Sequence, residues 1–392
     1  MNEHILSMPV SEMTSLNFEC ECGKRHSIDI GDIIIDRGVS DRVYEVAKKH
    51  MSKKTLLVAD CHTWEVLGEK VYQQLTDKGC EVRTLVFPDK HLFPNNTTLG
   101  ELLIEASDEA DPISLMIAVG SGTLNDVTRY ISGRLGLPYI IVGTAPSMDG
   151  YAGNSSPIIC RNNKISFFSH YPDAIIADTD IMAAAPEIMI AAGFGDVVGK
   201  YVSLADWRLG KIHVNETHCE FISRFMGSAV EKCVANVEGV AAKAPEAIKT
   251  QVEVLCLSGL AMGLATVTRP ASGSEHQMTH FCDLDCIANG RDYPLHGNTV
   301  GVATIATLRM YEMAREDGLT DIMTPSVDEM IGYYKLLNAP TRPEQIGLSR
   351  ELWHRALMEA KDLRDRMGIL RLSHERGRLA YYADIITKEM CD

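Results

Sequence analysis

The sequence predicts an α/β fold for its first half and an all-helical fold for its second half. Short apolar segments alternate with longer helical patterns over residues 33–143, which is typical of βαβ units and a parallel sheet. From about residue 187 the strand patterns stop and amphipathic helical patterns continue to the end. We therefore expect a Rossmann-like domain over 1–180 and a helical domain over 181–392, with no flexible linker between them.

The individual elements follow from this alternation. The expected strands are 33–35, 55–59, 80–87, 113–119 and 139–143. The expected helices between them are 40–50, with Ser40 as N-cap, then 62–76 and 99–110. Long helical patterns follow at 188–209, 219–241, 245–267, 277–288 and 299–315. Their Ala, Met and Leu stripes indicate core packing rather than cofactor contacts.

The segment 113–126 changes abruptly from a buried strand to a tight turn, Gly120-Ser121-Gly122, and then to a helix start. Small residues let a bound group approach the backbone, and the free N–H groups of a helix N-terminus favour an anion. The pyrophosphate of a dinucleotide is such an anion. A strand, turn and helix without a ligand would have the same pattern, so the glycines alone do not decide.

Two other strand ends carry polar side chains, and ligands of parallel sheets gather at the carboxyl ends of strands. The Asp60 carboxylate can accept hydrogen bonds from a ribose or an adenine amine, or it can be an ordinary turn residue. The chain lacks G-x-G-x-x-G there, which moves phosphate binding to the Gly120 turn. After 139–143, Thr144, Ser147 and Asp149 surround Pro146 in a turn that could also be a plain Asx turn.

Composition excludes several classes of partner. The chain has 392 residues, of which 45% are hydrophobic and 23% are charged, and its formal net charge is -15. Nucleic acid and anionic membranes would be repelled, and an anionic substrate would need a local cation. No signal segment or membrane insertion is expected, which favours a cytoplasmic protein. The 11 cysteines, an odd number, fit a reducing compartment.

Cys20, Cys22 and His26 resemble one half of a zinc site. The chain has no second Cys/His pair at a suitable spacing, so the sequence favours a hairpin turn at Gly23 over a metal site.

Three groups of polar residues interrupt the apolar helical patterns of the second half. Asp196 follows Gly193-Phe194-Gly195, with Lys200 one helical turn later on the same face. His276 and His280 lie one turn apart on the next such segment, and His296 precedes the helix that begins near residue 299. An Asp and two His are oxygen and nitrogen ligands for Zn²⁺, Fe²⁺ or Ni²⁺ with positions left open, which favours a catalytic site. Each His could equally be a satisfied core or surface residue.

Together the strings GSGTLND, TAPSMDGYA, GFGDVVGK, GSEHQMTH and LHG resemble the iron-containing (group III) alcohol dehydrogenase superfamily, over about 55–296. The string TAPSMDGYA and the segment 205–208 are most similar to its bacterial sn-glycerol-1-phosphate dehydrogenases. Glycerol dehydrogenase and dehydroquinate synthase are other members. The resemblance implies the dehydroquinate synthase-like fold, a homodimer and one divalent metal (zinc, nickel or iron). It also implies NAD or NADP, with a small phosphorylated three-carbon substrate.

The resemblance also assigns residues. It implies metal contacts at Asp196, His276 and His296, and substrate contacts at Asp149, Asp196 and His280. Implied cofactor contacts are Asp60, Gly120, Gly122, Thr123, Leu124, Asn125, Asp126, Thr144, Ala145, Pro146 and Ser147. Gly153 stands where the family usually has Ser, so Asn154 or Ser155 would have to replace that cofactor contact.

The expected reaction is hydride transfer between NAD(P)H and dihydroxyacetone phosphate, which gives sn-glycerol 1-phosphate. His280 is the expected proton relay, and Asp149 is expected to orient a substrate hydroxyl. Lys200 or Arg269 would hold the phosphate. Three alternatives stay open: a glycerol dehydrogenase, a dehydroquinate synthase-like lyase and a non-catalytic nucleotide or metal sensor. Relatives of the lyase kind generally have Glu at the position of Asp196, which disfavours the lyase.

Overall fold

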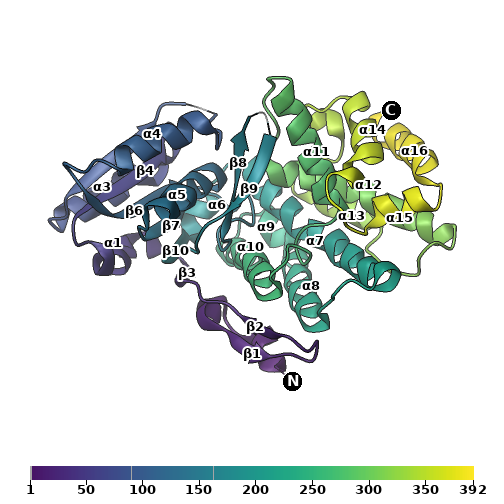
Figure 1. Ribbon diagram of the computed structural model, residues 1–392, viewed down its shortest axis with the longest axis horizontal. Helices are drawn as coiled ribbons and strands as arrows, with labels where there is room; N and C mark the ends of the chain where they lie inside the picture. Colours follow the sequence, from purple (N-terminus) through teal and green to yellow (C-terminus); the bar gives the residue numbers. More distant parts are fainter. Residues whose placement is uncertain (1, 90, 162) are drawn as a thin grey trace.

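Six parallel strands form one sheet in the computed structural model, which describes residues 2–89, 91–161 and 163–392 (Figure 1). Their order across the sheet is β3-β10-β7-β6-β4-β5, and every neighbouring pair is parallel. The strands are β3 Asp32–Asp36, β4 Lys54–Asp60, β5 Val82–Phe87, β6 Ile113–Gly120, β7 Tyr139–Gly143 and β10 Ala174–Asp178. The predicted α/β fold of the first half is confirmed.

Both faces of the sheet are covered by helices, which explains why its inner strands are largely apolar. Leu57 of β4 packs in one cluster with α1 (Val43–Ala47) and α3 (Glu69–Asp77). Its neighbour Leu56 points to the opposite face, where α4 (Asn96–Ala106) and α5 (Gly122–Leu135) lie. That second core continues without a break into the helical half of the molecule.

The helix predicted over 40–50 is in fact three short pieces, η3 Val39–Arg42, α1 and η4 Lys48–His50. The prediction of Ser40 as an N-cap is wrong, because Ser40 lies inside η3, whose N-cap position is Gly38. Its hydroxyl instead donates to Asp178 Oδ2 at 2.6 Å and so holds the end of β10. The pattern at 62–76 is likewise divided into α2 Cys61–Thr63, the π-helix η5 Trp64–Gly68 and α3.

Three strands have no counterpart among the predicted elements. The antiparallel hairpin of β8 (Ser155–Cys160) and β9 (Asn163–Phe168) projects from the sheet domain toward the helices, and β10 joins the sheet. β9 is mostly exposed, so it lacks the apolar face by which strands are recognised. The hairpin is anchored by Lys164, whose ammonium contacts Asp283 Oδ2 at 2.8 Å.

The second half consists of packed helices, as predicted. After α6 (Thr179–Ala183) they are α7 Glu187–Val214, α8 Glu220–Val234, α9 Val237–Ala241, α10 Pro245–Ala265, α11 Ser274–Ala288, α12 His296–Glu316, α13 Val327–Leu336, α14 Arg350–Glu359, α15 Ile369–Glu375 and α16 Leu379–Cys391. The single helix expected over 219–241 is interrupted after Val234. Short 3-10 turns, η6 Pro343–Ile346 and η7 Ala360–Asp362, complete this half.

Two of these helices, α7 and α10, are long and apolar enough to cross a membrane by length and composition alone. Their most apolar windows are 78% and 67% buried inside the protein, respectively. Core helices of folded proteins have this character, so the two helices are weak evidence for a membrane span.

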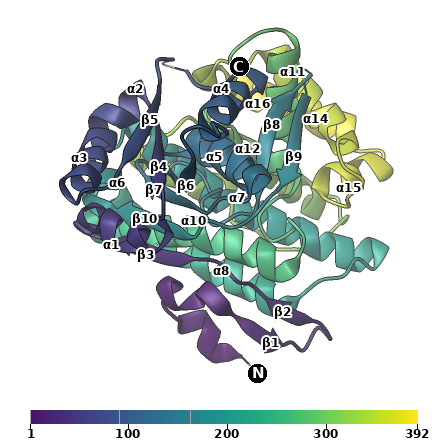
Figure 2. The same cartoon turned by 60° about the vertical axis from the view of Figure 1, so that its left-hand side comes forward.

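The chain begins with the 3-10 turns η1 (Glu3–Ser7) and η2 (Val10–Ser15) and the hairpin of β1 (Asn17–Glu19) and β2 (Arg25–Ser27). Gly23 lies in its turn with φ of +81°, a conformation that glycine adopts without strain. The predicted hairpin turn is thus confirmed. This hairpin lies against α8 and α10 of the helical half, below the rest of the molecule in Figures 1 and 2. The boundary proposed near residue 180 stays a prediction.

Candidate metal centre

Three helices bring Asp196, His276 and His296 together. Asp196 lies on α7, His276 in the first turn of α11 and His296 at the start of α12. One ligand atom from each lies within 4.8 Å of the others, and His276 Nε2 is 3.6 Å from Asp196 Oδ1. The imidazole rings of His276 and His296 have centroids 5.2 Å apart. The residues that the sequence singled out as metal ligands therefore converge.

Glycines allow this convergence, because α7 and α12 touch backbone to backbone. A Cβ atom on Gly195 would lie 2.3 Å from the Gly297 carbonyl oxygen, and one on Gly297 would lie 1.9 Å from the Ala192 carbonyl oxygen. Distances this short are not compatible with a side chain. Gly195 and Gly297 each immediately adjoin a ligand, so the close helix contact sets the spacing between Asp196 and His296.

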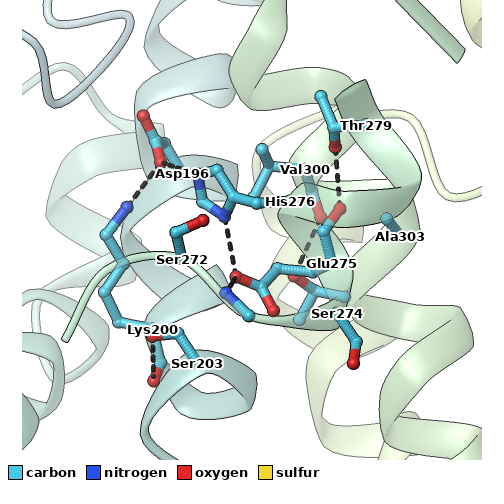
Figure 3. Close-up of polar contacts among 12 residues, drawn as sticks. Asp196, Lys200, Ser203, Ser272, Ser274, Glu275, His276, Thr279, Val300 and Ala303 are labelled. Atoms are coloured by element: carbon cyan, nitrogen blue, oxygen red, sulfur yellow. Dashed lines mark hydrogen bonds and ion pairs between the residues drawn. The ribbon is translucent and has the colours of Figure 1, made fainter. Parts of the chain in front are cut away.

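His276 is held between two carboxylates (Figure 3). Its Nδ1 lies 2.7 Å from Glu275 Oε1, which also accepts a hydrogen bond from the Gly273 N–H at 2.8 Å. A carboxylate only accepts, so Nδ1 carries the proton and Nε2 presents its lone pair toward Asp196. Metal-binding histidines usually have such a partner on the other ring nitrogen. Glu275 was not among the residues predicted from the sequence, although its position directly before His276 was a usable signal.

The electrostatics of the three residues fit a divalent cation. Burial, together with the Lys200 charge, lowers the pKa of His276 to about 4, and burial and His276 lower that of His296 to about 3. Both imidazoles are therefore neutral at neutral pH. Burial and the neighbouring Asp149 raise the pKa of Asp196, so that a nearby cation would favour its charged form. His296 Nδ1 is buried and has no hydrogen-bond partner among the described residues. One carboxylate and two imidazoles suit zinc, nickel or iron.

Lys200 connects Asp196 to the sheet domain. Its ammonium lies 2.5 Å from Asp196 Oδ1 and 2.8 Å from Asp149 Oδ2, and it is fully buried. The Asp149 N–H donates to Asp196 Oδ2 at 3.0 Å, and the Ser258 hydroxyl donates to Asp149 Oδ2 at 2.7 Å. Burial opposes ionisation of Asp149, but Lys200 and His276 lower its pKa to about 2. Two carboxylates and one ammonium thus form a connected group across the two halves.

His280 lies one turn beyond His276 on α11. Its ring centroid is 6.4 Å from that of His276 and 6.0 Å from that of His296. Burial lowers its pKa well below the ordinary value, and the positive charges of Lys164 and Arg364 add to the effect. Neither of these two cations was among the residues predicted from the sequence. The expected cation Arg269 instead pairs with Glu216, with 2.7 Å from Nε to Oε1.

The expected cofactor residues lie along the carboxyl edge of three adjacent strands. Asp60 ends β4, Gly120 ends β6, and the Thr144 N–H donates to the Gly120 carbonyl at 3.1 Å after β7. The Asp60 carboxylate caps α2 by accepting from the Thr63 N–H at 2.8 Å. Ser121 makes no side-chain capping hydrogen bond to the described residues at the start of α5. The helix N-terminus that the sequence predicted at Gly122 is therefore present and lacks a cap from its own N-cap residue.

The first turns of α5 are tied to the loop that carries Asp149. Asn125 Nδ2 donates to the Gly150 carbonyl at 3.0 Å, and the buried Arg129 guanidinium contacts Asp126 at 3.0 Å. Arg129 also donates to the carbonyls of Gly150, Tyr151 and Ser155 and to the Tyr139 hydroxyl. Burial raises the pKa of Asp126 to about 7, with Arg129 opposing the shift. Arg129 was not among the residues expected from sequence; a buried arginine is invisible to apolar patterning.

Hydrogen bonds also fix the rest of the loop over residues 144–153. The Tyr151 hydroxyl donates to the Ala145 carbonyl at 2.6 Å, and Gln251 Nε2 donates to the Pro146 carbonyl at 3.0 Å. The Ser147 N–H donates to the Ala145 carbonyl at 3.0 Å, and the Gly153 N–H donates to the Gly150 carbonyl at 3.4 Å. The predicted turn over 144–149 therefore packs directly on α10.

Comparison with known proteins agrees with these features. The family described as iron-containing alcohol dehydrogenase matches residues 34–186. A glycerol-1-phosphate dehydrogenase of Geobacillus stearothermophilus, whose name includes NAD(P)+, is 30% identical over 92% of this chain and 96% of its own length. The enzyme of the same name from Methanocorpusculum labreanum is 34% identical over 79% of each chain.

The fold is shared with solved structures. The crystal structure of glycerol dehydrogenase from Schizosaccharomyces pombe superposes with a TM-score of 0.67 at 19% identity and covers 91% of this chain and 90% of its own. The sequence similarity, which extends over nearly the whole length of both chains, is the stronger finding. The chain belongs to the glycerol-1-phosphate dehydrogenase family, within the iron-containing alcohol dehydrogenases.

Proposed function

We propose that the protein interconverts dihydroxyacetone phosphate and sn-glycerol 1-phosphate with NAD or NADP and one divalent metal ion. The observation that carries the proposal is the contact between the Asp149 N–H and Asp196, which joins the nucleotide-binding edge of the sheet to the Asp-His-His group. Hydride transfer needs the nicotinamide and the reacting carbonyl to meet, and the contact of these two sets of residues supports a meeting point here. The names of the relatives support the substrate.

Each residue of the centre has a task in this proposal. Asp196, His276 and His296 would hold the metal, which when bound polarises the substrate carbonyl as a Lewis acid while NAD(P)H supplies the hydride. The substrate oxygen then needs a proton, and His280 relays it, directly or through water. Asp149 orients a substrate hydroxyl. Lys200 balances the charges of the two acids, because two buried carboxylates side by side repel each other.

The cofactor would lie along the carboxyl edge, with its pyrophosphate at the start of α5. Asp60 would contact the adenosine ribose or adenine, and the nicotinamide would reach the turn after β7. The proposed contacts are Asp60, Gly120, Gly122, Thr123, Leu124, Asn125, Asp126, Thr144, Ala145, Pro146, Ser147 and Gly153. Their placement at adjacent strand ends supports the proposal.

The substrate phosphate needs a cation that is not already committed, and Lys200 and Arg269 are both paired with carboxylates. Arg364 forms no ion pair within the described chain, and its hydrogen-bond partner there is the Ser272 hydroxyl at 3.5 Å. It lies close enough to His276 and His280 to lower the pKa of both. We assign Arg364 to the phosphate. Lys164 on the hairpin β8–β9 adds positive charge near His280 and His296, but it is itself paired with Asp283.

The experiment that tests this function compares substrates on one enzyme. Chelated protein receives zinc, nickel or iron separately, and NADH and NADPH oxidation is followed with dihydroxyacetone phosphate and with dihydroxyacetone. We expect turnover of the phosphorylated substrate to dominate and Asp196→Ala to abolish it without unfolding the protein. Equal turnover of both substrates would favour a glycerol dehydrogenase. No net NAD(P)H change would favour a lyase or a sensor.

The proposal also includes a cellular compartment and an oligomeric state. None of the 11 cysteines forms a disulfide, which supports the cytoplasm as the compartment. A homodimer is proposed from the family resemblance alone, and sedimentation of the purified protein would test it.

A further inference from the structure

A second group of metal-binding side chains lies far from the Asp-His-His centre. Cys20, Cys22 and His26 belong to the N-terminal hairpin, and Cys219 is the N-cap residue of α8. One ligand atom from each lies within 4.8 Å of the others. Cys219 is 193 residues from His26 along the chain, yet its sulfur lies 3.3 Å from His26 Nε2. The fold therefore supplies the ligand that the sequence motif lacked.

The distances within this cysteine cluster are those of a tetrahedral site. Cys20 Sγ lies 3.6 Å from Cys219 Sγ, and Cys22 Sγ lies 3.3 Å from His26 Nε2. Zinc–sulfur bonds of about 2.3 Å and a zinc–nitrogen bond of about 2.0 Å at tetrahedral angles separate two sulfurs by about 3.8 Å and a sulfur from a nitrogen by about 3.5 Å. Small side-chain shifts would thus place all four atoms around one ion.

The His26 ring is oriented as a ligand would be. Its Nδ1 lies 2.7 Å from the Leu264 carbonyl oxygen at the end of α10. A carbonyl only accepts, so Nδ1 carries the proton and Nε2 directs its lone pair at the sulfurs of Cys22 and Cys219. The ring is only 2% exposed. A backbone carbonyl on the remote nitrogen is the usual partner of a metal-bound histidine.

Burial raises the pKa of the Cys219 thiol to about 12, but one backbone N–H group favours its thiolate form. The Ile222 N–H points at its sulfur, with 3.5 Å between nitrogen and sulfur, and the first turn of α8 begins there. Backbone N–H groups at a helix N-terminus stabilise a thiolate. A thiolate is the form of cysteine that binds metal.

We propose that Cys20, Cys22, His26 and Cys219 bind one zinc ion in a closed structural site. Three thiolates and one imidazole fill the four positions that structural zinc uses, so no position is left for a substrate. The three thiols release their protons as the ion binds. Soft thiolate ligands favour zinc over magnesium or calcium. This proposal does not depend on the reaction proposed above.

A zinc ion at this site would attach the N-terminal hairpin to the helical half of the protein. The hairpin has little buried area of its own, and a two-stranded hairpin is marginal in water. Its present contacts with the helical half include the Phe18 and Phe221 rings at 5.2 Å and the His26–Leu264 hydrogen bond, and Glu3 before the hairpin forms an exposed ion pair with Arg224. A zinc ion shared by the hairpin and α8 would fix that position much more firmly.

The test begins with metal content. Full-length protein, purified with a reductant, is stripped by chelation and reloaded with zinc, and bound metal is measured by mass spectrometry. We expect two zinc ions per chain, one for each of the two ligand groups. Cys219→Ser should lose one ion and keep dehydrogenase activity, and Asp196→Ala should lose the other. Cys160→Ser, a half-buried cysteine outside the cluster, should keep both.

Cobalt and X-ray absorption identify the ligands themselves. Co²⁺ bound to the wild type should show thiolate-to-cobalt charge-transfer absorption, which persists in Asp196→Ala and disappears in Cys219→Ser. The zinc X-ray absorption spectrum of the wild type should contain a sulfur shell near about 2.3 Å, a measurement that needs no variant to fold. Absence of the sulfur shell, or unchanged cobalt spectra in Cys219→Ser, would overturn the proposal. A Cys20–Cys219 disulfide in reductant-treated protein would overturn it as well.

Discussion

The Glu275 carboxylate holds the imidazole of His276 at 2.7 Å, and this contact turns the other ring nitrogen toward Asp196. Glu275 is itself fully buried, and one of its oxygens, Oε2, has no hydrogen-bond partner among the described residues. Burial raises the pKa of Glu275 to about 7. A positive ion bound on the far side of the imidazole would favour the charged form of Glu275.

Glu275→Gln should therefore weaken metal binding by about 10–100-fold, because Gln keeps the shape but loses the charge that makes His276 a stronger ligand. Competition with a chromogenic chelator measures the affinity. Glu238→Gln, an exposed site on α9, is the matched control and should leave the affinity unchanged. Equal affinities in both variants would remove Glu275 from the centre.

Gly195→Ala should destabilise the protein by about 1–3 kcal/mol and reduce its metal content, because the new Cβ meets the Gly297 carbonyl oxygen. Urea unfolding and bound-metal analysis measure the two effects. Gly332→Ala, on α13 with open space around it, should instead stabilise by about 0.5–1 kcal/mol. A Gly195→Ala protein with normal stability and metal would mean that α7 and α12 can separate freely.

Arg364→Met should raise KM for dihydroxyacetone phosphate by about tenfold or more, since a charge-assisted hydrogen bond to the phosphate is lost. The KM for dihydroxyacetone should hardly change. Arg371→Met, which breaks an exposed ion pair with Asp365, serves as control. A similar rise of KM for both substrates would contradict the assignment.

Lys200→Met should impair both substrates to a similar extent, because it leaves the carboxylates of Asp149 and Asp196 without their shared cation. The same pair of kinetic assays checks this. If the loss fell mainly on dihydroxyacetone phosphate, Lys200 would be the phosphate ligand after all.

Asp126 makes stability depend on pH. Its pKa is about 7 in the folded protein and 3.8 as the ordinary value, so the folded state binds the extra proton between these limits. Its contribution to stability is therefore greatest below about pH 4 and falls as pH rises toward 7, by at most about 1.4 kcal/mol per pH unit. Asp126→Asn should remove this slope in urea titrations from pH 4 to pH 7. An unchanged difference between variant and wild type across that range would show that Asp126 does not titrate there.

Sequence patterns were sufficient to predict the fold where a local run of residues had a single physical explanation. The alternation of apolar strands with helical patterns predicted the parallel sheet, whereas the close approach of Gly195 to Gly297 was not predicted and only the fold reveals it. The strand β9 escaped because it is mostly exposed, and β8 escaped because only Ser156 and Ile158 of its residues are buried, too few for a clear apolar pattern. The buried Arg129 and the half-buried Arg364 escaped because single cations do not alter hydrophobic periodicity.

Prediction from the sequence was also limited where residues far apart along the chain meet in the fold. The N-terminal motif with Cys20 has a partner, Cys219, that lies 199 residues away. No local spacing rule connects them. Asp196, His276 and His296 are spread over three helices in the same way. The residue types suggested a metal site, but only the resemblance to known sequences selected these two of the three histidines.

The backbone contact between Gly195 and Gly297 also bears on how this protein could change. Main-chain atoms, not side chains, determine the distance between Asp196 and His296. Mutations elsewhere in the core should therefore change the dimensions of the metal centre very little. To fit a larger ion in this centre, the crossing of α7 and α12 would have to be redesigned. Replacing the ligand residues alone would leave the distance between the two helices unchanged.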